Sequence, residues 1–231
     1  MQLQVTLDTS RLDQCIELLE QVHAYVDVVE VGNPLMIEAG LSLVEGLRHE
    51  FPQMEICADA KIVNSGHYIA SHCFDRGATM VTIMAIAADQ TIEGAVASAE
   101  LAGGKVMADL TGVQDVATRA RELEELGVTY LCGHTGFEDR QLASNPFADA
   151  RPGIAHAIRS VFGYDNPLRE LDLIHANTRG VALPAIVGRI DENNIDEVVS
   201  HGPELIIVGR AIAGSVNPAH AAADLREHFV R

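Results

Sequence analysis

Four carboxylates lie inside or at the ends of short apolar runs, where water cannot fully solvate a charge. They are Asp8, Glu30, Asp59 and Asp109. A buried carboxylate is destabilising unless a cation, a metal or hydrogen bonds compensate it. Each one alone could be the N-cap of a following helix, but four at equivalent positions indicate one shared pocket. Oxygen ligands of this kind suit Mg²⁺, which takes one or two carboxylates and leaves room for water and substrate oxygens.

The segment Asp59-Ala60-Lys61 is the sharpest local signal, and Lys61 is one of only two lysines in the chain. On a strand, residues i and i+2 point to the same side, so Asp59 and Lys61 are expected to share the pocket. An ammonium beside a carboxylate stays protonated, and it could stabilise an enolate or carbanion that develops on a substrate. The alternative is an internal salt bridge that only fills space.

Polar residues also end the later apolar runs. His134 could move protons near neutral pH, although a single histidine can equally be structural. Gly188-Arg189 and Gly209-Arg210 end two further runs. Glycine lets backbone N–H groups approach a phosphate, and arginine can bind a phosphate through two parallel hydrogen bonds. We expect a phosphate site there; the alternative is two ordinary turns that carry surface arginines.

The elements that would position these residues are short β-rich runs that alternate with longer, helix-periodic runs. This alternation predicts a parallel sheet, and eight such units in 231 residues predict a single (β/α)₈ TIM barrel over residues 1–231. The C-terminal ends of all strands then meet at one mouth, where the loops after strands seven and eight commonly bind phosphate. An open doubly wound sheet is the alternative, but no G-x-G-x-x-G follows the first run. We expect strands at residues 3–7, 26–31, 55–61, 80–84, 105–110, 128–132, 181–187 and 205–208, and helices at 12–25, 34–50, 66–76 and 218–230, with others ending near 102 and 127.

One interval breaks the regular spacing of the strand ends. His134 and Gly188 are 54 residues apart, and the sequence between them holds several Asn-Pro and Gly-rich turn signals. We expect a long sixth βα loop, a helix, and an extra segment near residues 163–180 before strand seven. A long loop in a compact domain is either functional, as a lid or contact, or a surface excursion without a role.

Composition excludes several classes of function. The chain is 48% hydrophobic but only 4% aromatic, which suits an aliphatic core of buried parallel strands. Its net charge of −17 argues against nucleic acid and against anionic membranes as partners. No apolar stretch reaches the roughly 18 residues of a membrane span, and the N-terminus does not resemble a signal peptide. The four scattered cysteines are typical of a reducing compartment, so we expect a cytoplasmic protein.

Taken in order, these motifs resemble the orotidine 5′-phosphate decarboxylase superfamily, and more closely its sugar-phosphate branch of 3-hexulose-6-phosphate synthase and 3-keto-L-gulonate-6-phosphate decarboxylase. The resemblance implies homodimers of (β/α)₈ barrels with active sites near the dimer interface. It also implies Mg²⁺, held by the carboxylates that match Glu30 and Asp59, and an enediolate intermediate on a phosphorylated sugar. Lys61 and His134 would assist, with Asp109 beside them. The matching motifs are Leu7-Asp8, Val28–Gly32, Ala58–Ile62, Val81–Ile83, Asp109, His134–Phe137 and Val208–Ile212.

Within this branch, some motifs resemble the synthase and others resemble the decarboxylase. His134–Phe137 resembles the synthase, which would join ribulose 5-phosphate to formaldehyde, whereas Gly209-Arg210 resembles the decarboxylase. The balance favours the synthase, a Mg²⁺-dependent aldehyde-lyase, with Asp8 and the Gly-Arg pairs assigned to substrate and phosphate. The family motif D-x-K-x-x-D ends here in Asn64, which keeps hydrogen bonding but carries no charge. A decarboxylase, a sugar-phosphate isomerase and a non-catalytic sugar-phosphate-binding barrel stay open as alternatives.

Overall fold

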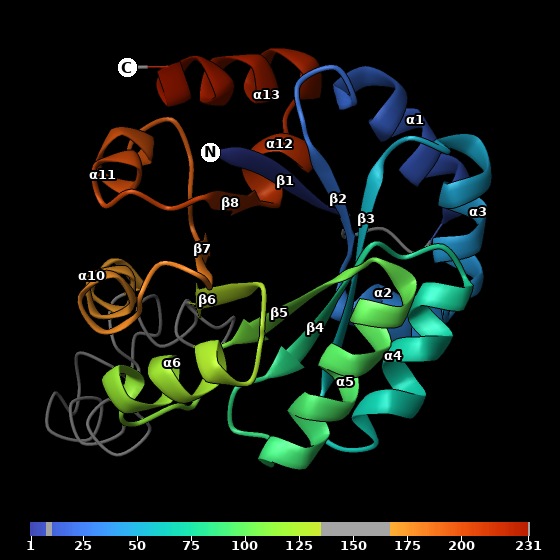
Figure 1. Ribbon diagram of the computed structural model, residues 1–231. Helices are drawn as coiled ribbons and strands as arrows, with labels where there is room; N and C mark the ends of the chain where they lie inside the picture. The colour runs from blue at the N-terminus through green and yellow to red at the C-terminus, as the bar shows by residue number, and fades with distance from the viewer. Residues whose placement is uncertain (8–10, 135–166, 231) are drawn as a thin grey trace, which may run out of the picture.

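The computed structural model describes residues 1–7, 11–134 and 167–230, and these form a closed eight-stranded barrel (Figure 1). Every strand pairs in parallel with its sequence neighbours, and β1 pairs with β8 to close the ring. The predicted TIM barrel is therefore confirmed. The strands are β1 (Gln2–Leu7), β2 (Val28–Val31), β3 (Glu55–Ile62), β4 (Met80–Met84), β5 (Lys105–Asp109), β6 (Tyr130–His134), β7 (Leu183–Val187) and β8 (Leu205–Val208).

Helices surround the barrel, and most of them follow a strand as expected. The expectation of one helix over 34–50 is wrong, because Gly40 adopts φ 66° and splits it into two. Residues 218–230 form a helix and then a 3₁₀ turn, and the short α12 was not predicted. The helices are α1 (Leu12–Val22), α2 (Asn33–Ala39), α3 (Ser42–Glu50), α4 (Gly66–Asp75), α5 (Asp89–Ala102), α6 (Val116–Glu125), α10 (Pro167–Asn177), α11 (Ile195–Ser200), α12 (Arg210–Ala213), α13 (Pro218–Glu227) and η1 (His228–Val230).

Strand alternation divides the core into two layers. On β1, Leu3, Val5 and Leu7 are fully buried in the larger apolar cluster, whereas Gln4 and Thr6 occupy the alternate positions. A second, smaller cluster is formed by strand residues alone: Val28, Cys57, Met80, Met107, Tyr130, Cys132, Ala185, Leu205 and Ile207. The first cluster therefore joins strands to helices, and the second fills the barrel interior.

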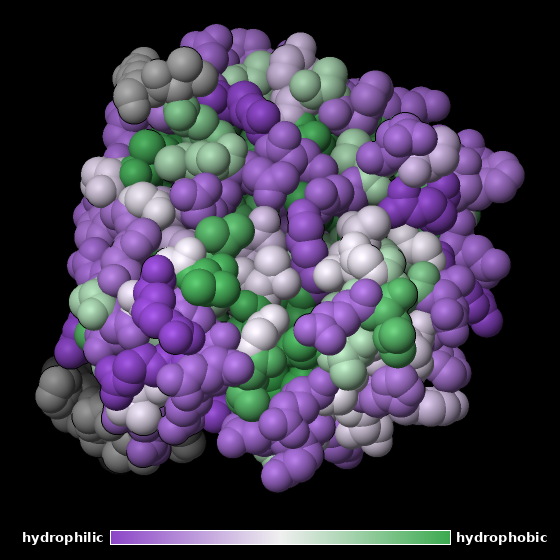
Figure 2. Space-filling view, in the orientation of Figure 1, coloured by the Kyte–Doolittle hydropathy of each residue, from purple (hydrophilic) through white to green (hydrophobic). Residues whose placement is uncertain are grey.

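The surface is mainly hydrophilic, with hydrophobic side chains gathered near the middle of the face in Figure 2. All four cysteines are buried, and none of them forms a disulfide bond. Within the described ranges, no helix combines the length and the apolar character that a membrane span needs.

The helix α10 lies where the extra segment near 163–180 was expected. It packs against α6 and against β6 and β7, which is the position of the sixth helix of the barrel. Residues 163–166 of that segment, like the long loop before it, lie outside the described residues.

The chain between α10 and β7 is held by one buried carboxylate, Glu124 on α6. It accepts backbone N–H bonds from Arg179 at 2.9 Å, from Val181 at 2.9 Å and from Ala182 at 3.2 Å. Burial acts to raise the pKa of Glu124, but these donors outweigh it and lower the pKa to about 2. Because two of these N–H groups are taken by Glu124, β7 begins at Leu183 rather than at the expected Val181.

We expect Glu124→Gln to lower the free energy of unfolding by about 2 to 4 kcal/mol, because three backbone N–H groups lose their charged acceptor. The pKa of Glu124 is lower in the folded chain than its ordinary 4.5, so its contribution is full above that pH and falls as the pH drops toward 2. Urea denaturation at pH 7 measures the change. The exposed neighbour in Glu125→Gln should change it by less than about 0.5 kcal/mol. Equal effects of the two substitutions would contradict this account.

Candidate active site

A cavity of about 1500 Å³ opens at the C-terminal ends of the strands. It is lined by residues from the ends of all eight strands or from the loops that follow them. Ten of the eleven predicted site residues fall in the described ranges. Nine of those ten line the cavity: Glu30, Asp59, Lys61, Asp109, His134, Gly188, Arg189, Gly209 and Arg210. Asn64, exposed just after β3, does not line it. Asp8 lies outside the described residues.

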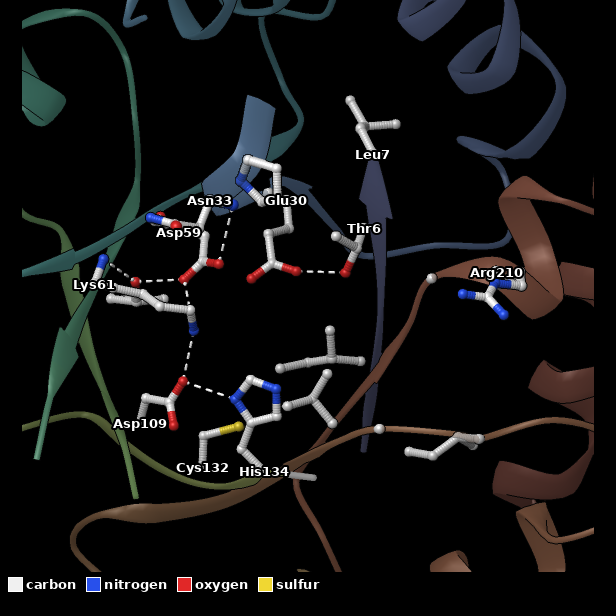
Figure 3. A pocket seen from close by; sticks show the side chains of 18 of the residues that line it. Thr6, Leu7, Glu30, Asn33, Asp59, Lys61, Asp109, Cys132, His134 and Arg210 are labelled. Atoms are coloured by element: carbon white, nitrogen blue, oxygen red, sulfur yellow. Dashed lines mark hydrogen bonds and ion pairs between the residues drawn. The ribbon is translucent and has the colours of Figure 1, made fainter. Parts of the chain in front are cut away.

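The carboxylate of Asp109, at the end of β5, joins two predicted catalytic residues (Figure 3). Its Oδ2 lies 2.6 Å from Lys61 Nζ and 2.8 Å from His134 Nδ1, while its Oδ1 accepts the backbone N–H of Thr111 at 2.9 Å. Burial acts to raise the pKa of Asp109, but His134 and Lys61 outweigh it and hold the pKa well below its ordinary value. Asp109 is therefore an ionised anchor and a weak base.

This contact also fixes the proton on His134. An ionised carboxylate only accepts hydrogen bonds, so His134 Nδ1 must carry the proton that it shares with Asp109. The other ring nitrogen, Nε2, is then the one that can take up or release a proton. The backbone N–H of His134 donates to the buried Glu170 on α10 at 3.1 Å, which ties the end of β6 to the helix outside it.

Asp59, on β3, is held from three sides. Its Oδ1 accepts the hydroxyl of Thr82 at 2.7 Å and lies 3.3 Å from Lys61 Nζ, and its Oδ2 accepts the backbone N–H of Asn33 at 3.1 Å. The side-chain amide of Asn33 also donates a hydrogen bond to the backbone carbonyl of Asp59 at 3.1 Å. The orientation of this carboxylate is therefore set before any ligand binds.

Lys61 combines a fixed charge with an unusual backbone. Burial acts to lower the pKa of its ammonium, but Asp109 and Asp59 outweigh it and raise the pKa above the ordinary value. Lys61 therefore stays protonated. Its φ is 41°, in a left-handed region that costs a non-glycine residue about 1 to 3 kcal/mol and that is often found at functional sites. Of the other two described non-glycine residues with positive φ, Arg189 lines the cavity and Ser65 is the N-cap of α4.

Glu30, on β2, is the least satisfied carboxylate of the pocket. Burial and the nearby charge of Asp59 raise its pKa to about 8, although the hydroxyl of Thr6 donates to its Oε2. Two buried carboxylates that repel each other at the edge of a cavity are suited to a shared divalent cation.

The chemistry of Glu30 and Asp59 therefore fits Mg²⁺, which would relieve this repulsion and leave positions for water and substrate oxygens. Among the described residues, no group of three or more histidine, cysteine or acidic side chains is arranged to hold a metal.

The opposite side of the cavity carries the predicted phosphate residues. Gly188 has φ 119°, which only glycine adopts readily, and Gly209 precedes α12. Arg189 and Arg210 are exposed, and neither guanidinium forms an ion pair with a described residue. Figure 3 shows Arg210 across the cavity from Lys61. Both arginines are thus available to an anion.

Sequence reasoning missed the polar residues that hold the carboxylates and His134 in place: Thr6, Asn33, Thr82, Thr111 and Glu170. The threonines on β1 and β4 had a usable signal, because each stands at an interior-facing position by the same two-residue period that selects Asp59. Glu170 had none, because its contact with β6 spans 36 residues of sequence.

Comparison with known proteins identifies the family of the chain. Residues 1–225 match the orotidine 5′-phosphate decarboxylase / HUMPS family. The chain belongs to this family. It is 33% identical to 3-hexulose-6-phosphate synthase of Bacillus subtilis (strain 168) over 231 residues, which is 100% of both chains. The predicted resemblance is confirmed at the level of the family.

Solved structures of the same family are also similar to this chain. A crystal structure of 3-hexulose-6-phosphate synthase has a TM-score of 0.83 at 30% identity, and the match covers 99% of this chain and 100% of that one. The 3-keto-L-gulonate-6-phosphate decarboxylase of Vibrio cholerae O1 biovar El Tor has a TM-score of 0.77 at 26% identity, over 100% of this chain and 97% of that one. The relatives in this family include lyases of both kinds.

We expect Glu30→Gln to weaken Mg²⁺ binding at least tenfold, because one of two facing carboxylates loses its charge. Isothermal titration calorimetry at pH 8 measures the affinity. In the unsubstituted chain the affinity should rise between pH 6 and pH 8, because Mg²⁺ must displace the proton that the raised pKa of about 8 keeps on Glu30. Glu38→Gln, at an exposed position of the same cavity, is the control and should leave the affinity unchanged. Unaltered binding in Glu30→Gln would exclude Glu30 as a ligand.

Proposed function

We propose that this protein is a Mg²⁺-dependent carbon–carbon lyase that acts on a ketose phosphate through an enediolate, most like 3-hexulose-6-phosphate synthase. The observation that carries the proposal is the linked arrangement of Lys61, Asp109 and His134 beside the facing carboxylates Glu30 and Asp59. It combines a permanent positive charge, a histidine whose Nε2 has no hydrogen-bond partner among the described residues, and a place for a divalent cation.

The phosphate of the substrate would bind at Gly188 and Gly209 with Arg189 and Arg210, on the β7–β8 side. The carbonyl end of the sugar would then face the carboxylate side, where Lys61 lies. Mg²⁺, when bound, would stabilise negative charge on the oxygens of the sugar. Opposite charges on the two sides of the cavity therefore orient the substrate.

His134 Nε2 would remove the proton from the carbon beside the carbonyl group, which leaves the electron pair in an enediolate. The ammonium of Lys61 would stabilise the negative oxygen without giving up its own proton. The enediolate carbon would form a bond to the carbon of formaldehyde, and the carbonyl electrons of formaldehyde would move to its oxygen. His134 would then return the proton to that oxygen, so protons and electrons balance.

A decarboxylase on the same site is the second candidate, supported by the structural similarity to 3-keto-L-gulonate-6-phosphate decarboxylase and by Gly209-Arg210. Loss of CO₂ would leave the same enediolate, and a proton would then be added to carbon. The synthase is favoured by the 33% identity to a synthase over the full chain and by His134–Phe137, of which only His134 lies in the described residues.

We further propose a homodimer in which the partner covers the region after β3. Val63 and Tyr68 expose hydrophobic surface there, next to the exposed Asn64, and Ile86 exposes more after the neighbouring β4. In that arrangement Asn64 would approach the partner's site with an uncharged amide.

Turnover of ribulose 5-phosphate with formaldehyde tests the reaction directly. We expect loss of formaldehyde in the presence of Mg²⁺ and none after chelation, because the facing carboxylates need the cation. Product analysis by NMR distinguishes the synthase from an isomerase. If the folded protein binds the sugar phosphate but consumes no formaldehyde, the synthase is excluded, and CO₂ release from keto-acid phosphates then decides between a decarboxylase and a binding barrel.

Lys61→Ala should reduce turnover by about 100- to 1000-fold, because the developing negative charge loses its fixed cation. Lys105→Ala is the matched control, since Lys105 is the other lysine of the chain and pairs with Glu55 at 2.6 Å at the start of β5. Steady-state kinetics on both variants, with circular dichroism to check the fold, measure the effect. Near-normal turnover in a folded Lys61→Ala variant would overturn the proposed site.

A further inference from the structure

The strand pair β3–β4 is irregular at the site. Cys57 pairs with Met80 and Ala58 with Val81, but the next pair is Ile62 with Ile83. Three residues of β3, from Asp59 to Lys61, therefore stand opposite the single residue Thr82. The D-x-K segment is a bulge, and its last residue has the left-handed φ of 41°.

The hydroxyl of Thr82 closes this bulge. The backbone N–H of Lys61 donates to Thr82 Oγ1 at 2.9 Å, in place of a regular ladder bond. The same hydroxyl donates its proton to Asp59 Oδ1 at 2.7 Å. One buried oxygen thus links the first and last residues of the bulge, and Thr82 is only 2% exposed.

A hydroxyl is suited to this place because one atom must both accept from an N–H group and donate to a carboxylate. The single proton of Thr82 is already given to Asp59, so it is not free for a substrate. Valine has nearly the same shape but can make neither bond, whereas serine can make both.

We propose that Thr82 is a positioning residue, which holds the backbone of Lys61 in its left-handed conformation and so directs the ammonium to Asp109 and Asp59. This inference rests on the proposed function for its kinetic test, but its structural test does not depend on turnover. The consequence is that loss of the Thr82 hydroxyl misplaces Lys61 while the phosphate-binding side of the cavity is unchanged.

The structural test uses the scarcity of lysine. Because Lys61 and Lys105 are the only lysines, a protein labelled with ¹³C,¹⁵N-lysine gives two lysine backbone amide signals. Thr82→Val should move the amide and Cα signals of Lys61 and leave those of Lys105 in place. Thr82→Ser should leave both close to their original positions. Unmoved Lys61 signals in Thr82→Val would overturn the proposal.

Thr79→Val is the matched control. Thr79 Oγ1 accepts the backbone N–H of Ile56 at 2.9 Å, so it also joins β3 to β4 through a hydroxyl, but at the end away from the cavity. The carbonyl of Thr79 accepts the N–H of Lys105 at 2.9 Å. Any lysine signal that this variant moves should therefore be that of Lys105 and not that of Lys61.

The kinetic test separates positioning from general stability. Thr82→Val should lower kcat about 100-fold with KM for the sugar phosphate changed by less than about threefold, because misplaced catalytic groups affect the reaction more than phosphate binding. Thr82→Ser should restore kcat to within about fivefold of the original, and Thr79→Val should leave it unchanged. Loss of kcat in Thr79→Val to the same extent would overturn the proposal.

If Thr82→Val does not fold, Thr82→Ala replaces it in both tests with the same expected results. If the unsubstituted protein shows no turnover, the proposed function fails, and the lysine signals alone then decide the role of Thr82.

Discussion

The contact between Lys61 and Asp109, at 2.6 Å, is the interaction on which the rest of the site depends. The barrel mouth buries three carboxylates, Glu30, Asp59 and Asp109, and such a group would be destabilising without a cation among them. Lys61 reaches two of the three. The His134 ring and the Lys61 ammonium together keep Asp109 ionised, and the ionised Asp109 in turn orients the ring of His134. Glu30, which Lys61 does not contact in this way, is the carboxylate with the raised pKa.

The barrel makes this concentration of charge possible by separating it from the apolar core. On several strands an interior apolar residue is followed two positions later by a polar one, as with Val28 and Glu30, or Met107 and Asp109. The two-residue period of a strand places both residues on the interior face at different heights. The apolar layer excludes water from below, which strengthens the electrostatic interactions above it. On these strands, the sequence pattern therefore specifies both the apolar layer of the interior and the polar residues of the site above it.

Much of the fold and of the candidate site could be predicted from the sequence, because both depend on the local spacing of residues. The alternation of strands and helices predicts the barrel, and the polar residues at strand ends predict the set that lines the cavity. The boundaries were harder: β7 starts late because Glu124 takes two of its expected N–H groups, a contact that spans more than 50 residues of sequence. The supporting residues Asn33 and Glu170 were missed for the same reason. Their roles depend on which strands become neighbours, and spacing along the chain does not contain that information.

In the D-x-K segment, the sequence predicts the orientation of Asp59 and Lys61 correctly but not the backbone that produces it. Regular alternation predicts that Asp59 and Lys61 face the same side, and their 3.3 Å contact agrees. The backbone between them is nevertheless not a regular strand, because it bulges opposite Thr82 and turns left-handed at Lys61. A regular strand would direct both side chains by its pleat alone, whereas the bulge makes the direction of Lys61 depend on a hydroxyl of the next strand. The position of the Lys61 ammonium therefore depends on the pairing of β3 with β4. The spacing of residues within β3 cannot specify it.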